Sequence, residues 1–225
     1  MNLICMRNAG INGLFLTALI TAFFSLPTTL DASTTIFLTE GERKLVGQGD
    51  LAVREIATTN KPGRTFEAIG LINAPRNIIL QVLTAYEKYP EFMPNVSRID
   101  IVEQRGDETV LNYTLTLPLG KIKKYRLKIS LTAHDKQASM IQWHLQRWPG
   151  LKTAETIRDT TGYWRIEERT KNSSLVLYHV YTDPGPIPFG LGWIVDVMSK
   201  NSVPEALLQT KARTEKIALK GNAQK

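Results

Sequence analysis

The chain has 225 residues, of which 43% are hydrophobic, so it is long enough to bury the core of one domain with additions. Its formal net charge of +7 is a moderate excess, which suits solubility or attraction to an anionic lipid surface or nucleic acid. The only cysteine, Cys5, precedes the first apolar run. Disulfides, cysteine nucleophiles and thiolate metal sites are therefore excluded from the chain beyond that run.

The N-terminal segment has the pattern of a secretory signal. Arg7 precedes an uncharged apolar run, Ile11 to Leu26, and small and polar residues follow it. Because a spanning helix needs roughly 20 apolar residues, we expect residues 1–32 to be a signal peptide cleaved near Ala32. Leu30 is larger than the residue usual at the minus-three site, so an uncleaved membrane anchor is the alternative. Export across an inner membrane, into a periplasm, makes nucleic acid the less favoured partner.

A short arm and a hairpin are predicted next. Residues 33–50 mix apolar, charged and glycine residues, which indicates a short helix or an irregular arm. Residues 51–57 alternate as a strand does, and the Asn, Pro and Gly of residues 58–63 are typical of a turn. The run 65–72 is the second strand of this predicted hairpin.

The stretch from Asn73 to Val96 predicts a pair of helices. Ala74-Pro75 begins a helical pattern, and proline suits a first helical turn. One face of this helix is apolar, with Ile78, Ile79, Val82 and Leu83. After Ala85, aromatic and proline residues indicate a second, short helix folded against the first. We expect its residues to form a wall or lid over one end of the sheet: Tyr86, Tyr89, Phe92 and Pro94.

Further strands are predicted between this helix pair and residue 183. Most of them alternate apolar and polar residues with a period of two, whereas the last is apolar on both faces. Short turns between successive strands imply an antiparallel meander. The expected strands are 96–104, 109–117, 121–131, 139–145, one within 154–168, and 175–182.

The last part of the chain predicts a closing helix. Three prolines and two glycines in residues 183–190 end the sheet, and the pattern is helical from Leu191 to about Leu219. Pro204 removes a backbone donor, so we expect a break near it, with Ser202 as a candidate cap. The predicted fold class is α+β: residues 51–221 form a curved antiparallel sheet that grips a long C-terminal helix, with a helix pair after an early strand.

Several motifs in this order resemble the START-like or SRPBCC superfamily. They are the "AP" and "YPEFMP" of the helix pair, then "GYWRIEE", "LYHVYTDPGPIPFG" and the mid-helix "VPEAL". The superfamily includes coenzyme-Q-binding proteins, polyketide cyclases and lipid-transfer START domains. The resemblance spans about Leu38 to Lys220 and implies the helix-grip fold. No residue set selects quinone, sterol, phospholipid or polyketide as the ligand.

The apolar inner face of the sheet can be filled by side chains or can enclose a cavity of a few hundred cubic ångströms, as typical ligand pockets do. Sequence does not distinguish a core residue from a residue that lines a cavity. Tyrosines on inward positions favour a cavity, because a buried phenol needs a hydrogen-bond partner. We therefore predict binding, with transport as an extension, of a lipid or isoprenoid, and neither a cofactor nor a metal. The expected lining is Tyr113, Leu115, Tyr125, Leu127, Ile129, Trp143, Trp164, Tyr178, Val180, Trp193, Val203 and Leu207.

An enzyme acting on the bound molecule, of the cyclase, aromatase or hydrolase type, is the alternative. The three histidines, His134, His144 and His179, are scattered and have no metal-site spacing. No nucleophile elbow, phosphate loop or dinucleotide fingerprint occurs. Tyr178 with Arg147 is the best catalytic pair that the sequence offers. We therefore expect a protein that binds without catalysis.

The strand 121–131 has a basic outer face. Such a charge run is commonly a solvated strand face, but lysine and arginine near anionic lipid each add about 1 kcal/mol of attraction. A carrier of hydrophobic molecules must approach a bilayer to load. Transient docking on an anionic membrane is therefore predicted, while the oligomeric state is left open. The predicted docking residues are Lys121, Lys124, Arg126 and Lys128.

Overall fold

The computed structural model describes residues 35–58, 61–133, 138–185 and 200–222. All of them belong to one compact unit, Ser33–Lys225. The predicted signal peptide, residues 1–32, lies outside the described residues, so it stays a prediction. Among the residues described, no helix is long and apolar enough to cross a membrane.

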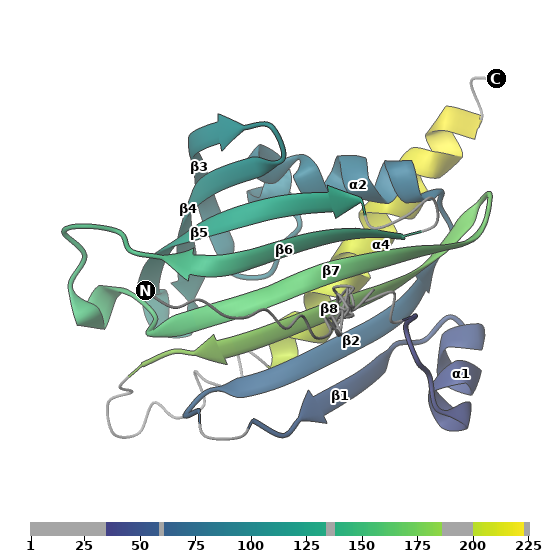
Figure 1. Cartoon of the computed structure of the whole chain (residues 1–225), viewed down its shortest axis with the longest axis horizontal. Helices are drawn as coiled ribbons and strands as arrows, with labels where there is room; N and C mark the ends of the chain where they lie inside the picture. The colour runs from purple at the N-terminus through teal and green to yellow at the C-terminus, as the bar shows by residue number, and fades with distance from the viewer. Residues whose placement is uncertain (1–34, 59–60, 134–137, 186–199, 223–225) are drawn as a thin grey trace, which may run out of the picture. The chain divides into compact units, whose positions relative to one another are not determined.

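An eight-stranded antiparallel sheet forms the body of this unit (Figure 1). Its order is β1-β2-β8-β7-β6-β5-β4-β3, so the last strand returns to pair with β2. All other neighbours are consecutive in the chain, which confirms the predicted meander. The strands are β1 Ala52–Ile56, β2 Arg64–Ile72, β3 Val96–Arg105, β4 Glu108–Leu117, β5 Lys121–Ala133, β6 Ala138–Gln146, β7 Asp159–Thr170 and β8 Ser173–Asp183.

The helices occur where the sequence predicts them, with differences at their ends. The helix pair is α2 Arg76–Thr84 followed by the 3-10 helix η1 Tyr86–Glu91, and the closing helix is α4 Ser202–Asn222. Short 3-10 turns, η2 Pro118–Gly120 and η3 Thr153–Glu155, precede β5 and β7. Because η3 occupies residues 153–155, β7 begins later than the predicted segment does. The predicted helical residues 191–199 lie outside the described residues. The α+β helix-grip fold class is confirmed.

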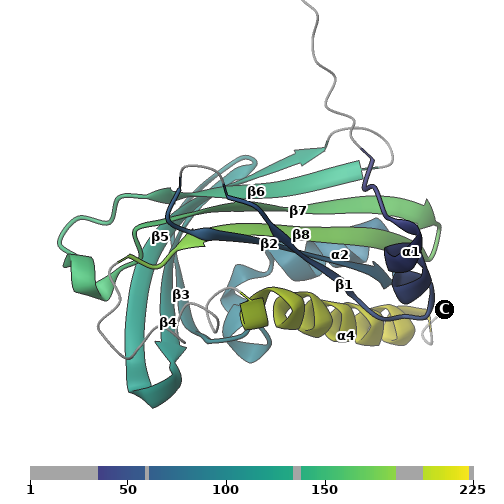
Figure 2. The ribbon, with the colours of Figure 1, turned by 90° about the horizontal axis from the view of Figure 1, so that it is seen from below.

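One face of the sheet, here named the inner face, is covered by α4 and α2 (Figure 2). Alternate residues of neighbouring strands, such as Phe66, Ile141 and Ile166, share one buried cluster with Val203 and Leu207 of α4. Burial of this apolar surface is the main force that holds helix and sheet together.

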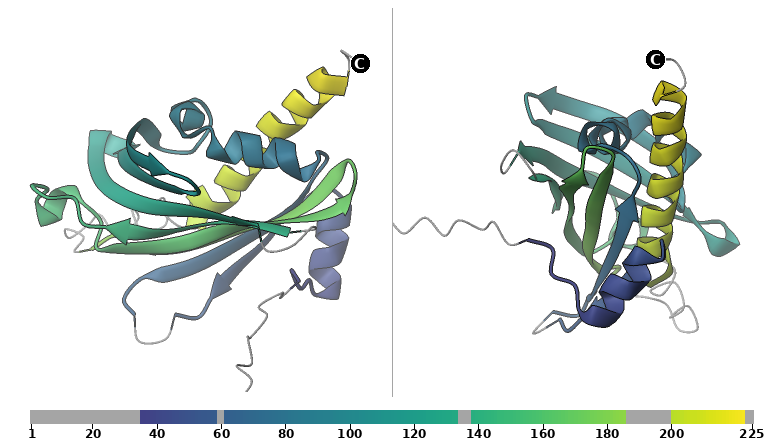
Figure 3. Two further views of the ribbon diagram at one scale, coloured as in Figure 1. Left: turned by 45° about the horizontal axis from the view of Figure 1, so that its top comes forward. Right: turned by 90° about the vertical axis from the view of Figure 1, so that its right-hand side faces the viewer.

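The opposite, outer face is also covered, at the β1, β2 and β8 side, by the N-terminal arm and α1 Glu40–Gly47 (Figure 3). Ile36 and Val46 from the arm and α1 pack against Ile69 of β2 and Leu175 of β8. This second layer explains why β8 is apolar on both faces. Of the two alternatives expected for residues 33–50, the short helix is the one found, and a capping box formed by Thr39 and Glu42 begins it.

A chain of ionic contacts attaches α1 to the outer face. Arg54 of β1 donates to both carboxylate oxygens of Glu42, at 2.5 and 2.6 Å, and also reaches Glu67 at 3.3 Å. His179 Nδ1 lies 2.9 Å from the other oxygen of Glu67, and its ring stacks on Tyr163 at 4.8 Å. His179 is therefore a structural partner rather than an incidentally packed histidine. Sequence reasoning missed it because Glu67 is 112 residues away in the chain, although it is the direct partner of His179 in the sheet.

The second half of α4 is attached to the sheet and to the helix pair by polar contacts. Lys211 Nζ donates to the carbonyl of Leu71 at 2.6 Å, and Glu215 accepts from the backbone N–H of Asn73 at 2.8 Å. Arg213 pairs with Glu91 of η1 at 2.9 Å. The first turns of α4 pack instead over the inner face through Val203 and Ala206.

Gly162 of β7 provides a test of the inner-face packing. A β-carbon there would lie 2.3 Å from Trp143 Cζ2 and from the His179 carbonyl oxygen. We expect Gly162→Ala to lower the free energy of unfolding by about 1–3 kcal/mol, the usual cost of overpacking. Gly41→Ala in α1, where nothing lies within 4 Å, is the matched control and should be neutral or stabilising. Urea unfolding of both variants measures this, and equal stability of the two would contradict the packing described.

Glu42 provides a pH test of the outer layer. Its hydrogen bonds from Arg54 hold the pKa of its carboxyl at about 2, below the ordinary 4.5. The stabilisation is thus complete above about pH 4.5 and is lost as the pH falls toward 2. We expect Glu42→Gln to lower the free energy of unfolding by about 1.5–3 kcal/mol at pH 7. The difference from wild type should shrink between pH 5 and pH 2.

Unfolding in urea across this pH range measures the effect of Glu42. Glu87→Gln, on an exposed part of η1, is the control and should leave stability unchanged. A difference between wild type and Glu42→Gln that is as large at pH 3 as at pH 7 would show that Glu42 does not stabilise the fold through its ionised carboxylate.

Candidate ligand-binding cavity

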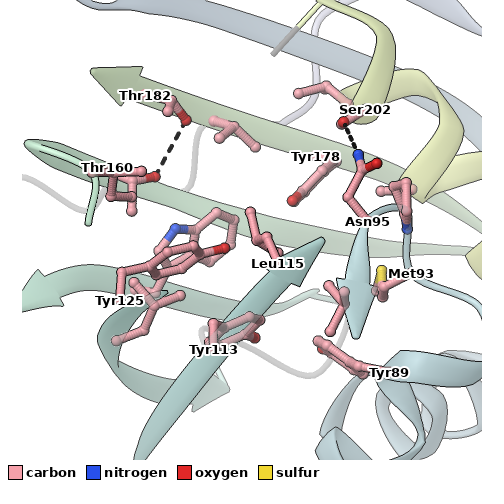
Figure 4. A pocket seen from close by; sticks show the side chains of 18 of the residues that line it. Tyr89, Met93, Asn95, Tyr113, Leu115, Tyr125, Thr160, Tyr178, Thr182 and Ser202 are labelled. Carbon is pink, nitrogen blue, oxygen red and sulfur yellow. Dashed lines mark hydrogen bonds between the residues drawn. The ribbon is translucent and has the colours of Figure 1, made fainter. Parts of the chain in front are cut away.

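A cavity of about 120 Å³ lies between the inner face of the sheet and the first turns of α4 (Figure 4). Strands β4 to β8 supply most of its wall. The segment that leads from η1 into β3 supplies Met93, Pro94 and Asn95, and α4 supplies Ser202, Val203 and Ala206. The cavity is thus built from segments that are far apart in the chain, and it forms only when α4 packs on the sheet.

Aromatic rings form much of the wall. Trp164 and Tyr178 stack with centroids 3.7 Å apart, and Trp143 lies 5.7 Å from Tyr178. Tyr113 and Tyr125, which are direct partners on β4 and β5, stack at 5.2 Å with an interplanar angle of 7°. These rings occupy much of the space above the sheet. The cavity is therefore smaller than the few hundred cubic ångströms expected from the sequence.

Of four tyrosine hydroxyls at this cavity, one has a hydrogen-bond partner, and the other three have none within the described wall. Tyr89 donates to the carbonyl of Leu83 at 2.6 Å, which fixes η1 against the end of α2. Among the described residues that line the cavity, none forms a hydrogen bond with the hydroxyl of Tyr113, Tyr125 or Tyr178. Burial raises the pKa of all three phenols above the ordinary value, and neighbouring phenols add to the effect at Tyr113 and Tyr125. The hydroxyls are therefore neutral donors at physiological pH.

The described part of the cavity wall carries no charged side chain and no histidine. Its other polar groups are largely paired with one another: Asn95 donates to Ser202 at 3.1 Å, and the hydroxyls of Thr160 and Thr182 lie 3.4 Å apart. No three His, Cys, Asp or Glu side chains cluster as metal ligands in the described ranges. The site thus suits a neutral, mainly apolar molecule.

The structure brings ten of the twelve predicted lining residues to this cavity. Leu207 is a correction: it is fully buried and packs over Gly70 of β2, outside the cavity wall. Trp193 lies outside the described residues. Whether the ten contact a ligand remains a prediction: they are Tyr113, Leu115, Tyr125, Leu127, Ile129, Trp143, Trp164, Tyr178, Val180 and Val203.

Sequence reasoning missed several lining residues, and strand alternation contains the signal for most of them. Leu117 shares the inward parity of Leu115, and Thr182 shares that of Val180. Asn95 and Ser202 belong to no periodic pattern. Of the predicted wall after α2, Tyr89 and Pro94 line the cavity, while Tyr86 and Phe92 pack beside Tyr89.

The candidate catalytic pair is not brought together at this cavity. Tyr178 lines it, whereas Arg147 is exposed after the end of β6 and is absent from the described wall. His144 is exposed on β6, as its parity predicts. His134 lies outside the described residues.

Only some of the basic side chains of β5 are available to contact a membrane. Lys128 pairs with Glu108 at 2.7 Å, and Arg126 donates to Asn112 at 2.8 Å. Lys121 and Lys124 are exposed. The predicted docking set therefore contains two residues whose side chains are already engaged with neighbouring groups.

Next to the two exposed lysines lies an apolar tip. Leu119 in η2 is 77% exposed and Ile122 at the start of β5 is 54% exposed. Leu119 has a positive φ of 61°, which is uncommon for a leucine and holds this turn in a tight form. The β4–β5 turn thus presents two large apolar side chains beside two lysines.

Comparison with known proteins gives the fold. No family model and no curated protein matches the chain. Human StAR-related lipid transfer protein 5 superposes with a TM-score of 0.64 at 12% identity, over 76% of this chain and 84% of its own. A STAR-related lipid transfer protein fragment from Xanthomonas axonopodis gives 0.61 at 15% identity, over 73% and 93%.

An enzyme has the same architecture. Zhui aromatase/cyclase from a Streptomyces species superposes with a TM-score of 0.53 at 13% identity, over 73% of this chain and 94% of its own. At such low identities the likeness shows the fold alone. The chain therefore has the START-type helix-grip fold of these lipid-transfer proteins and this aromatase/cyclase, which confirms the fold that the sequence resemblance implies.

Proposed function

We propose that this protein binds a hydrophobic small molecule in the cavity between the sheet and α4, and that such binding can serve transport. The observation that carries the proposal is the uncharged aromatic and aliphatic described wall, built mainly by β4 to β8 together with the first turns of α4. The lipid-transfer proteins that share the fold support it.

The size of the cavity limits what enters it without rearrangement. Pockets for drug-sized ligands usually have about 300–1,000 Å³, whereas this one has about 120 Å³. A larger molecule requires the cavity to widen. The second half of α4 is held by Lys211, Arg213 and Glu215, so widening is expected at its first turns, where the Asn95–Ser202 hydrogen bond joins α4 to the loop before β3.

The described wall supports binding better than acid-base catalysis. Its only titratable groups are tyrosines, and burial moves the pKa of Tyr113, Tyr125 and Tyr178 further from neutrality. Efficient proton transfer needs a group whose pKa lies near the operating pH. A cyclase-type activity remains the second candidate, because an aromatase/cyclase shares the fold.

Recovery of a ligand tests the proposed function. We expect native mass spectrometry of protein purified from its own compartment to show a bound small molecule. Ala206→Phe, which places a ring into the cavity from α4, should abolish the bound mass because it occupies the ligand's space. Leu208→Phe, on an exposed part of α4, is the matched control and should retain it.

Circular dichroism of both α4 variants checks that each is folded. Retention of the same ligand by folded Ala206→Phe would place the binding site elsewhere. Repeated recovery of the wild-type protein with no ligand would contradict the proposed function.

We further propose export to a periplasm, on the strength of the Ile11–Leu26 pattern, and transient docking on an anionic membrane. The exposed lysines and the apolar tip at the β4–β5 turn support docking, since lysines attract anionic headgroups while Leu119 and Ile122 enter the interface. Leu115 and Leu117, near the end of β4, line the cavity. A membrane that meets this turn is thus close to the bound molecule.

Liposome flotation tests docking. Lys121→Glu combined with Lys124→Glu should weaken binding to vesicles with anionic lipid by about thirtyfold or more, because each lysine contributes about 1 kcal/mol. Lys216→Glu with Lys220→Glu, at exposed positions near the end of α4, changes the net charge equally and should have a smaller effect. Equal losses in the two double variants would mean that net charge, and not the β4–β5 turn, governs binding.

A further inference from the structure

We propose that the part of the ligand held in this cavity is a neutral, flat ring that carries an oxygen acceptor, such as a ring ketone or quinone carbonyl. The inference rests on the proposed function and names the chemical class that the site takes. Its grounds are the charge, the unpaired donors and the shape of the described wall.

The ligand is inferred to be neutral because the described wall lacks charged side chains. No described lining residue carries a charge that could pair with an anionic or cationic group. Transfer of an unpaired ion from water into such a site costs several kcal/mol even after relaxation. The described wall therefore offers no partner to a phosphate, carboxylate or ammonium headgroup, and we infer that such a group stays outside in solvent.

The ligand is inferred to carry an oxygen acceptor because three tyrosine hydroxyls in the described wall are unpaired donors. Tyr89 already donates to Leu83, whereas Tyr113, Tyr125 and Tyr178 have no partner among the described lining residues. A purely hydrocarbon ligand would displace water and leave these donors unpaired, at the cost of their desolvation. A ligand oxygen that accepts from one or more of them removes that cost. The three hydroxyls come from β4, β5 and β8, so acceptors at different positions on a ring can be reached.

The ligand is inferred to be a flat ring from the shape of the wall and the volume of the cavity. The stacked pairs Tyr113–Tyr125 and Trp164–Tyr178 present flat surfaces, on which aromatic rings pack with face or edge contacts. A volume of about 120 Å³ is close to the roughly 150 Å³ of an engineered apolar cavity that binds benzene. One ring with a small substituent fits without rearrangement. Any longer tail on such a ring must leave the cavity or widen it.

Three compounds of nearly equal size separate these requirements. Acetophenone is neutral and has a carbonyl acceptor, isopropenylbenzene replaces that oxygen by a methylene group, and benzoate has an anionic carboxylate. Titration of the purified protein at pH 7, followed by ligand-observed NMR, gives their relative affinities. We expect acetophenone to bind about fivefold more tightly than isopropenylbenzene, for one hydrogen bond, and benzoate to bind most weakly.

Tyrosine variants identify the donor. Tyr113→Phe, Tyr125→Phe and Tyr178→Phe each remove one hydroxyl and retain the ring, and at least one of them should abolish the preference for acetophenone while binding isopropenylbenzene as before. Tyr163→Phe, on the outer face beside His179, is the matched control and should keep the preference.

The outcomes separate this inference from the proposed function. If isopropenylbenzene binds as tightly as acetophenone, the cavity still takes hydrophobic molecules but the acceptor requirement is wrong. If benzoate binds as tightly as acetophenone, neutrality is wrong. If a preference for acetophenone persists in all three tyrosine variants, these hydroxyls are not the donors. If none of the compounds binds at saturation, both the inference and the binding function at this cavity fail.

Discussion

The rest of the structure depends on how the first turns of α4 cover the aromatic inner face of the sheet. Alternation in β4 to β8 places large rings on one face, and that face must be shielded from water. Val203 and Ala206 shield it without filling the space beneath. A helix with larger side chains at these positions would convert the cavity into an ordinary core.

The remaining parts of the fold hold this arrangement in place. The outer layer of α1 and the arm covers the other face of β2 and β8, so these strands are packed on both sides. Lys211, Arg213 and Glu215 fix the second half of α4 to the end of β2 and to η1. These charged contacts lie away from the cavity, whereas Asn95 and Ser202, at the cavity end of α4, are joined by a neutral hydrogen bond, which is a weaker kind of contact.

The periodic pattern of apolar and polar residues was sufficient to predict the fold and the direction of most inner-face side chains. Tyr113 and Tyr125 were expected inward from parity alone, and they stack as direct strand partners. The cavity volume was not predictable, because it depends on how closely Trp143 packs against β7, which Gly162 permits. Leu207 was misplaced because helical periodicity does not reveal that Gly70 lets it approach β2. The pairing of Lys128 with Glu108 likewise depends on strand register.

A crystal structure of the protein with acetophenone bound is the most direct test of the account. We expect the ring in the space bounded by Tyr113, Tyr125, Trp164 and Tyr178, with its carbonyl oxygen about 2.7 Å from at least one tyrosine hydroxyl. A compound bound at saturating concentration only outside this cavity, with the cavity closed by side chains or holding water alone, would contradict it.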